Sequence, residues 1–383
     1  MSAAPGEKHM APTRRFAWRG LFAILVTTAA AFVSTAHAQA FRVEDVASGL
    51  VNPWSVAFLP RGQFLVTERP GRLRVVTADG RLLPPVAGVP EVVARGQGGL
   101  LDVILDSDFE RNRQLFFCFS EPGPQGNSTA LARAQLSPDM SRLDNLQVIF
   151  SQKPKVASNA HFGCRIVEAR DGALFMTMGD RFSRMDDAQK LDSHIGKVVR
   201  INKDGTPARG NPFLDRAGAL PEIWSYGHRN AQGATLAPDG SLWMHEHGPQ
   251  GGDEINVPQA GRNYGWPVVT FGEQYGGGKI GEGITSKAGM EAPLHYWVPS
   301  IAPSGMAFVT GDRYGRELKG NLFVGSLKFN QLVRLEMANG KVAREHRLQP
   351  VRERVRDVRQ GPDGLLYLLT DASNGRLVRL LPP

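Results

Sequence analysis

One short pattern of polar and apolar positions recurs six times along the chain. In each copy, a turn of glycine or polar residues precedes a run of apolar residues with strand character. The copies are "PRGQFLVTE" near Gly62, "RNRQLFFCF" near Arg113, "RDGALFMTM" at Gly172, "PDGSLWMHE" at Gly240, "LKGNLFVGS" at Gly320 and "PDGLLYLLT" at Gly364. Because Asp-Gly and similar pairs accept the positive φ of tight turns, each copy predicts a β-hairpin. Another short strand follows three of them, in "PGRLRVV", "FNQLVRLEM" and "NGRLVRLLPP".

The repeat predicts an all-β fold. Units of about 45 to 80 residues that consist of short strands and turns are typical of four-stranded blades around an axis. Six copies therefore predict a six-bladed β-propeller of four-stranded antiparallel blades. The widest spacing, from Gly240 to Gly320, predicts a long loop around "FGEQYGGGKIGEGITSK", and "FRVEDVA" is expected to supply the strand that closes the ring.

The first 38 residues differ in character from the rest. Basic residues come first (Lys8, Arg14, Arg15 and Arg19), then an uncharged apolar run over residues 21–33, then Ala36-His37-Ala38. This order predicts a secretory signal peptide over residues 1–38, followed by the propeller domain over residues 39–383. The apolar run is too short to span a bilayer, so we expect a periplasmic or secreted protein that is not membrane-spanning. Arg14-Arg15 leaves both general and twin-arginine export open.

Charge and cysteine content narrow the possible partners. The formal net charge is +8, but lysines and arginines are scattered among acids, which argues against nucleic acid as a partner. The two cysteines, Cys118 and Cys164, could form one disulfide in an exported chain or remain two buried thiols.

Polar residues gather in one segment between predicted strands, "WSYGHRNAQGATLAPDGSLWMHEHGPQGGDEINVPQAGRNYGWP". Burying so many polar groups is costly unless each has a partner. Within this segment, Gly248 and Pro249 form an irregular turn whose carbonyl oxygens are free of ladder hydrogen bonds. Hard cations such as Ca²⁺ bind such carbonyls readily, so the segment is a candidate calcium site.

The same segment resembles a known family. The string "GHRNAQG…EHGPQGGDEIN…GRNYGWP" is similar to the signature of the soluble glucose and aldose sugar dehydrogenases that depend on pyrroloquinoline quinone (PQQ), which are six-bladed propellers. Further matches are "GQGGLLDV" at Gln97, "HFGCR" at His161, "GSLKFNQLVRL" at Lys328 and "RVRDV" from Arg354 to Asp357. They follow the family's order and cover nearly the whole chain after residue 38.

The resemblance implies a binding site for PQQ, a tricarboxylate. Lys328, Arg354 and Arg356 match the family's carboxylate-binding positions, and arginine can bind a carboxylate through two parallel hydrogen bonds. Strand alternation places Arg354 and Arg356 on one face. Asn230 and Gln97 resemble cofactor-binding and site-lining positions.

The resemblance also implies Ca²⁺. Gly248 and Pro249 match the carbonyl ligands of the ion that polarises the quinone. Arg229, near the same quinone oxygen, would stabilise the negative charge that develops there. Glu254 and Tyr264, the latter through its carbonyl, match ligand positions of a second Ca²⁺ site.

His161 matches the family's general base. It would take the proton of the anomeric hydroxyl of an aldose while C1 passes a hydride to the quinone, giving a lactone. A small acceptor (quinone, dye or cytochrome) would then reoxidise the cofactor. The glucose-specific branch has an acid before this histidine, whereas this chain has Ala160, and Cys164 replaces a frequent glycine. Both differences favour the broad aldose branch and leave the partner that orients His161 unidentified.

Two alternatives remain compatible with the sequence. One is a Ca²⁺-dependent lactonase-type hydrolase, which would need acidic and amide side chains around a central metal rather than cations. The other is a non-catalytic propeller that binds a glycan or a protein and retains the family's scaffold.

Overall fold

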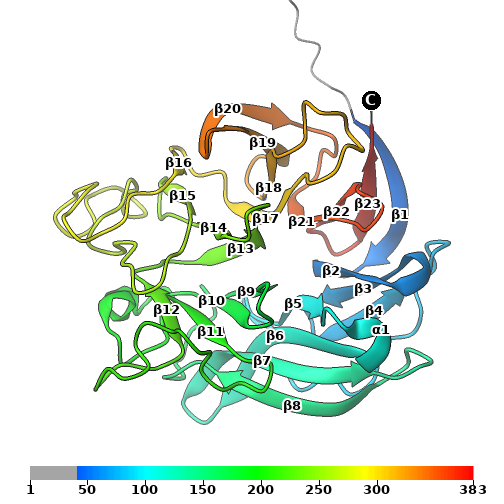
Figure 1. The fold of residues 1–383 in the computed structure, drawn as a ribbon, viewed down its shortest axis with the longest axis horizontal. Coiled ribbons are helices and arrows are strands. Elements are labelled where there is room, and N and C mark those ends of the chain that lie inside the picture. The colour runs from blue at the N-terminus through cyan, green and yellow to red at the C-terminus, as the bar shows by residue number, and fades with distance from the viewer. Residues whose placement is uncertain (1–40, 383) are drawn as a thin grey trace, which may run out of the picture. The chain divides into compact units, whose positions relative to one another are not determined.

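The computed structural model describes residues 41–382, and the predicted signal peptide lies outside the described residues. The described chain forms six antiparallel sheets arranged as the blades of a β-propeller (Figure 1). Neighbouring innermost strands contact one another around the ring. The predicted fold class is confirmed. No helix in this part of the chain is long and apolar enough to cross a membrane.

The blades follow the order of the chain, each from its innermost strand outwards. The first three consist of β2 (Pro53–Leu59), β3 (Gln63–Glu68) and β4 (Arg72–Val76); β5 (Leu100–Leu105), β6 (Gln114–Gly123), β7 (Gly126–Leu136) and β8 (Leu143–Ser151); and β9 (Gly163–Glu168), β10 (Leu174–Met178), β11 (Lys197–Ile201) and β12 (Ile223–Tyr226). The fourth and fifth consist of β13 (Ala231–Leu236), β14 (Leu242–Glu246), β15 (Asp253–Asn256) and β16 (His295–Trp297); and β17 (Pro303–Phe308), β18 (Leu322–Ser326), β19 (Gln331–Ala338) and β20 (Lys341–Leu348). The sixth consists of β21 (Val355–Gln360), β22 (Leu366–Thr370), β23 (Gly375–Leu381) and β1 (Arg42–Leu50). The described helices are short: η1 (Pro60–Gly62), α1 (Phe109–Asn112) and η2 (Met185–Gln189).

The six repeated phrases lead into the second strands of the six blades: β3, β6, β10, β14, β18 and β22. The first blade has three named strands, and its outer position is taken by an irregular segment. There Val76 bridges Leu82, and the Leu83 and Val86 amides donate to Val75 and Leu73. The long segment between β15 and β16 carries only isolated bridges, as the spacing of the repeats predicted.

The ring closes through the start of the described chain. β1 pairs antiparallel with β23, so the first strand becomes the outermost strand of the last blade, with the blue and red ends side by side (Figure 1). An apolar cluster that includes Val56 and Phe64 of the first blade and Leu368 and Val378 of the sixth fills the joint. This closure confirms the role predicted for "FRVEDVA".

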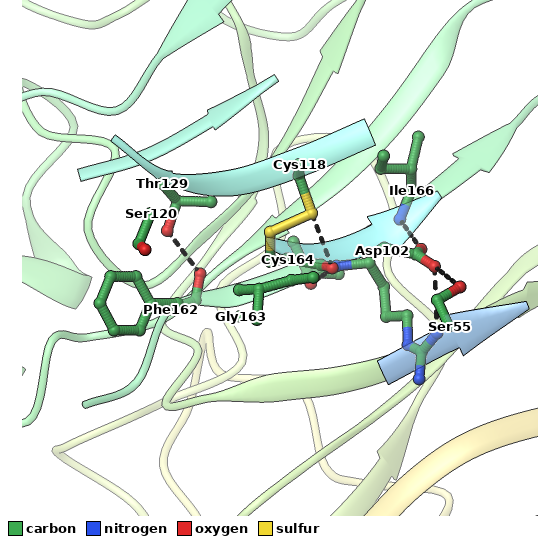
Figure 2. Close-up of a disulfide and its surroundings, with 12 residues drawn as sticks. Ser55, Asp102, Cys118, Ser120, Thr129, Phe162, Gly163, Cys164 and Ile166 are labelled. Atoms are coloured by element: carbon green, nitrogen blue, oxygen red, sulfur yellow. Dashed lines mark hydrogen bonds and ion pairs between the residues drawn. A yellow bond between two sulfur atoms is a disulfide. The ribbon is translucent and has the colours of Figure 1, made fainter. Parts of the chain in front are cut away.

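Ion pairs join the innermost strands at the axis. Arg165 of β9 lies 3.1 Å from Asp102 of β5 and 2.9 Å from Asp357 of β21, and Arg359 of β21 contacts the same two carboxylates at 2.6 and 3.1 Å. Asp102 also accepts hydrogen bonds from Ser55 and from the Ile166 amide (Figure 2). Two cations and two anions therefore compensate one another where four blades meet.

A disulfide links the second and third blades. Cys118 of β6 is bonded to Cys164 of β9, at a sequence separation of 46 (Figure 2). The sequence left open either a disulfide or two buried thiols, and the structure shows the disulfide. The bond anchors the start of β9, three residues after His161.

Candidate active site

The predicted site residues lie together because of the antiparallel hairpin in each blade. The start of an innermost strand and the end of the second strand fall at the same end of a blade. Predicted residues precede innermost strands (Gln97, His161, Arg229, Asn230 and Arg354) or follow second strands (Gly248, Pro249 and Lys328). The geometry of the hairpins therefore places them at one end of the ring.

His161 is buried, with 5% of its surface exposed, and its Nδ1 lies 2.6 Å from Oδ1 of Asp180, which follows β10. The other oxygen of Asp180 accepts a hydrogen bond of 2.8 Å from the indole of Trp266. A carboxylate at Nδ1 holds the proton on that nitrogen and leaves Nε2 as the proton acceptor. Asp180 is the orienting partner that Ala160 could not provide.

The electrostatic surroundings keep this imidazole neutral. Burial lowers the pKa of His161 below its ordinary value of 6.5, while the hydrogen bond and charge of Asp180 partly oppose the shift. The nearby cations Arg229 and Arg181 lower it further. A neutral imidazole with a free Nε2 is the form that a general base requires.

Two further side chains fix the loop that carries His161. Gln97 accepts a hydrogen bond of 2.8 Å from the His161 amide. Arg181 is fully buried, donates to the carbonyls of Ala160 and Ser158, and stacks 3.9 Å from the ring centre of Phe162. Residues on both sides of His161 are thereby held by one guanidinium.

Arg229 and Asn230 form the adjoining wall. Nη1 of Arg229 donates to the carbonyls of His247 and Gly248 at 3.0 and 2.7 Å, and Oδ1 of Asn230 accepts from the Gly163 amide at 3.1 Å. The Gly248 amide in turn donates to Asp253. The turn proposed as a metal ligand is therefore held in place by a charged residue on either side.

Lys328, Arg354 and Arg356 bring positive charge to the site. Arg354 and Arg356 both donate to Oδ2 of Asp371, at 3.2 and 2.8 Å, which confirms that they share one face. Asp371 follows β22 and, like Asp180, was not recognised from the sequence. A cavity of about 690 Å³ is lined by residues that include Gly248, Pro249, Tyr275 and Lys328.

Glu254 and Tyr264 lie in a second polar cluster. Glu254 pairs with Glu246 across β14 and β15, and the Asn256 amide donates to both carboxylates at 2.9 and 3.1 Å. Burial and the charge of Glu246 raise the pKa of Glu254 well above its ordinary value. Tyr264 stacks on His228, which itself contacts Glu246 at 3.0 Å.

Comparison with known proteins identifies the family of this chain. Residues 50–379 match the family described as Glucose / Sorbosone dehydrogenase. The chain is 44% identical over 345 residues to the aldose sugar dehydrogenase YliI of Escherichia coli (strain K12), covering 89% of this chain and 92% of that protein. The chain belongs to the glucose/sorbosone dehydrogenase family. Membership makes it a sugar dehydrogenase, an oxidoreductase, in place of the hydrolase or non-catalytic propeller considered from the sequence.

Solved structures of glucose/sorbosone dehydrogenase relatives share the fold. The soluble aldose sugar dehydrogenase from Escherichia coli, in its apo-form, superposes with a TM-score of 0.86 at 42% identity, covering 90% of this chain and 100% of that chain. The PQQ-bound form of aldose sugar dehydrogenase from Streptomyces coelicolor superposes with a TM-score of 0.72 at 27% identity, covering 89% and 98%.

Several buried donors in this family member remain without protein partners. Nε of Arg229, Nδ2 of Asn230 and Nε of Arg356 are buried and have no hydrogen-bond partner among residues 41–382. Leaving a buried donor unpaired costs about 1–3 kcal/mol. Three such donors on predicted cofactor-binding residues fit a ligand rich in acceptor oxygens. In the second cluster, Oδ1 of Asn256 is likewise unpaired beside two carboxylates, a set of oxygens that fits a hard cation.

Asp180 and Asp371 share a signal that the sequence did offer. Each is an acid immediately or almost immediately after a repeated strand phrase, in "FMTMGD" and "LYLLTD". The second strand of a blade ends at the same end of the ring as the predicted site. Aligning the six repeats by this position would have placed both acids at that end of the ring.

Proposed function

We propose that this sugar dehydrogenase oxidises aldoses to lactones, with PQQ and Ca²⁺ as cofactors and His161 as the general base. The observation that carries the proposal is the set of three buried, unpaired donors: those on Arg229 and Asn230, which adjoin the His161–Asp180 pair, and the one on Arg356. The PQQ-bound relative from Streptomyces coelicolor supports the choice of cofactor.

The chain's own residues would divide the work. Lys328, Arg354 and Arg356 would bind carboxylates of the cofactor, and Asn230 and Gln97 would line its site. Carbonyls of Gly248 and Pro249 would bind Ca²⁺, and Glu254 with the carbonyl of Tyr264 would bind a second ion. When bound, the quinone supplies a two-electron acceptor for the hydride from the sugar's C1.

His161 and Arg229 would handle the proton and the developing charge. Nε2 of His161 would take the proton of the anomeric hydroxyl, and Asp180 would stabilise the imidazolium that forms. The guanidinium of Arg229, buried and bonded to the carbonyl of His247, would stabilise that negative charge. A diffusible quinone, dye or cytochrome would accept the electrons afterwards.

We also propose that residues 1–38 are a signal peptide and that the mature protein, residues 39–383, is a single catalytic propeller in the periplasm or outside the cell. Mass spectrometry of the protein recovered from its native host would give the mature N-terminus, expected at Gln39. A start at Met1 would contradict this proposal.

Reconstitution tests the catalytic proposal. Purified apoprotein would be mixed with PQQ and Ca²⁺, and dye reduction would be followed with a panel of aldoses. We expect activity that requires PQQ and falls when Ca²⁺ is chelated, and little turnover by His161→Ala at unchanged PQQ affinity. No stimulation over cofactor-free protein would refute the cofactor, and full turnover by PQQ-bound His161→Ala would refute the base.

A further inference from the structure

Two large aromatic side chains are exposed beside His161. Phe182 has 55% and Tyr275 has 62% of its surface exposed. Their rings are stacked, with centroids 6.4 Å apart and an interplanar angle of 26°. Phe182 comes from the loop after β10 and Tyr275 from the long segment between β15 and β16, so loops of two blades build the pair. We call Phe182 and Tyr275 the aromatic pair.

The backbone of Phe182 is held in an uncommon conformation. Its φ is +65° and that of Arg181 is +58°, in the left-handed region that bulky residues rarely adopt. The Phe182 amide donates at 2.8 Å to the oxygen of Asp180 that also bonds His161. One carboxylate thus fixes both the base and the neighbouring ring, whose centroid lies 5.2 Å from that of the imidazole. Strain at such a place points to a functional requirement for the ring.

Tyr275 is positioned over the cavity. It contributes to the cavity lining together with Gly248, Pro249 and Lys328, and its ring centre lies 6.0 Å from the guanidinium carbon of Arg229. A cation near the face of a tyrosine is attracted by the ring's quadrupole. The guanidinium of Arg229 therefore helps to hold the exposed ring of Tyr275 in place.

We infer that the aromatic pair binds the apolar C–H face of a pyranose substrate; this rests on the proposed function. A substrate hydroxyl that reaches Nε2 of His161 brings the rest of the sugar against the side chains around the imidazole. The negative face of an aromatic ring attracts the slightly positive C–H groups of a sugar. The anionic cofactor has its own donors in Lys328, Arg229, Arg354 and Arg356, which leaves the aromatic pair for the neutral sugar.

The test uses Phe182→Leu and Tyr275→Ala, with Val148→Ala as the control. Val148 is also apolar and exposed, at 45%, but it lies on β8, the outermost strand of the second blade. With reconstituted enzyme, we expect kcat/KM for D-glucose to fall about 3- to 10-fold in each test variant, mainly through KM, because one aromatic contact is lost. PQQ affinity and Tm should stay unchanged, and the control should behave like the wild type.

A readout without turnover separates this proposal from the proposed function. Methyl β-D-glucopyranoside is blocked at O1, so saturation-transfer NMR reports its contacts without oxidation. We expect transfer from aromatic protons to the C–H groups of one face of the sugar, and less transfer in both test variants. Absence of PQQ-dependent turnover in the wild type would refute the proposed function, while the NMR result would still decide sugar contact.

Two outcomes would overturn the inference. One is unchanged kcat/KM and unchanged saturation transfer in both test variants. The other is a loss of PQQ affinity with normal sugar binding, which would assign the aromatic pair to the cofactor instead.

Discussion

Nδ1 of His161 lies 2.6 Å from Oδ1 of Asp180, and the second oxygen of that carboxylate is held by the indole of Trp266. Asp180 has 1% of its surface exposed, so its charge is compensated by these donors and by the amide of Phe182 rather than by water. The pair fixes the tautomer and the direction of the imidazole.

Asp180→Asn should lower kcat by about 10²- to 10⁴-fold, because the amide no longer fixes the Nδ1–H tautomer or stabilises the imidazolium. Steady-state kinetics of the reconstituted enzyme would measure the loss. PQQ affinity, titrated separately, should be close to that of the wild type. A kcat within threefold of the wild type would show that Asp180 does not orient the base.

We expect kcat/KM to fall at acidic pH, with the midpoint of the fall below pH 6.5. The base acts in its neutral form, and the pKa of His161 lies below its ordinary value because of burial, so activity is lost only as pH falls through that lowered pKa. In Asp180→Asn the midpoint should move to still lower pH, since Asp180 raises this pKa. A midpoint above pH 6.5, or a shift upwards in the variant, would contradict the electrostatic account.

Arg356→Ala should weaken PQQ binding about 10-fold or more, because a desolvated, charge-assisted contact to a carboxylate is lost. Arg354→Ala should act in the same direction with a smaller effect, since Arg354 is more exposed. Fluorescence titration of apoprotein with PQQ would measure both. Arg347→Ala on β20 is the control: it removes an arginine whose partner is Glu345 and should leave the affinity unchanged.

Arg165→Met should lower the free energy of unfolding by about 3–5 kcal/mol, because Asp102 and Asp357 would be left buried with Arg359 as their remaining cation. Urea denaturation would measure the change. Arg142→Ala, which breaks the exposed pair with Asp144, should cost less than about 1 kcal/mol. Equal effects of the two substitutions would mean that the axial network contributes little.

Removing the disulfide in Cys118→Ala/Cys164→Ala should lower stability by about 4 kcal/mol, as expected for releasing a loop of this length in the unfolded chain. In thermal unfolding, a reductant that opens the bond should likewise lower the Tm of the wild type. Insensitivity of the wild-type Tm to a reductant that demonstrably opens the bond would argue against a stabilising role.

The repeated strand phrases determined much of the fold without tertiary information. Hairpin turns and apolar runs are local features. Each of the six phrases therefore predicts one second strand from its own turn and its own apolar run, and these strands are β3, β6, β10, β14, β18 and β22. The resemblance of the chain's motifs to a family then assigned the roles of the site residues, which local pattern alone could not do.

Only the tertiary structure decided which side chains meet. The partner of His161 is 19 residues away, Arg165 meets Asp357 across the ring, and Phe182 meets Tyr275 from another blade. Such contacts depend on how the blades pack around the axis. The local pattern of polar and apolar residues does not specify that packing. The bond between Cys118 and Cys164 is of the same kind, because sequence gives their number and only the packing of two blades gives their distance.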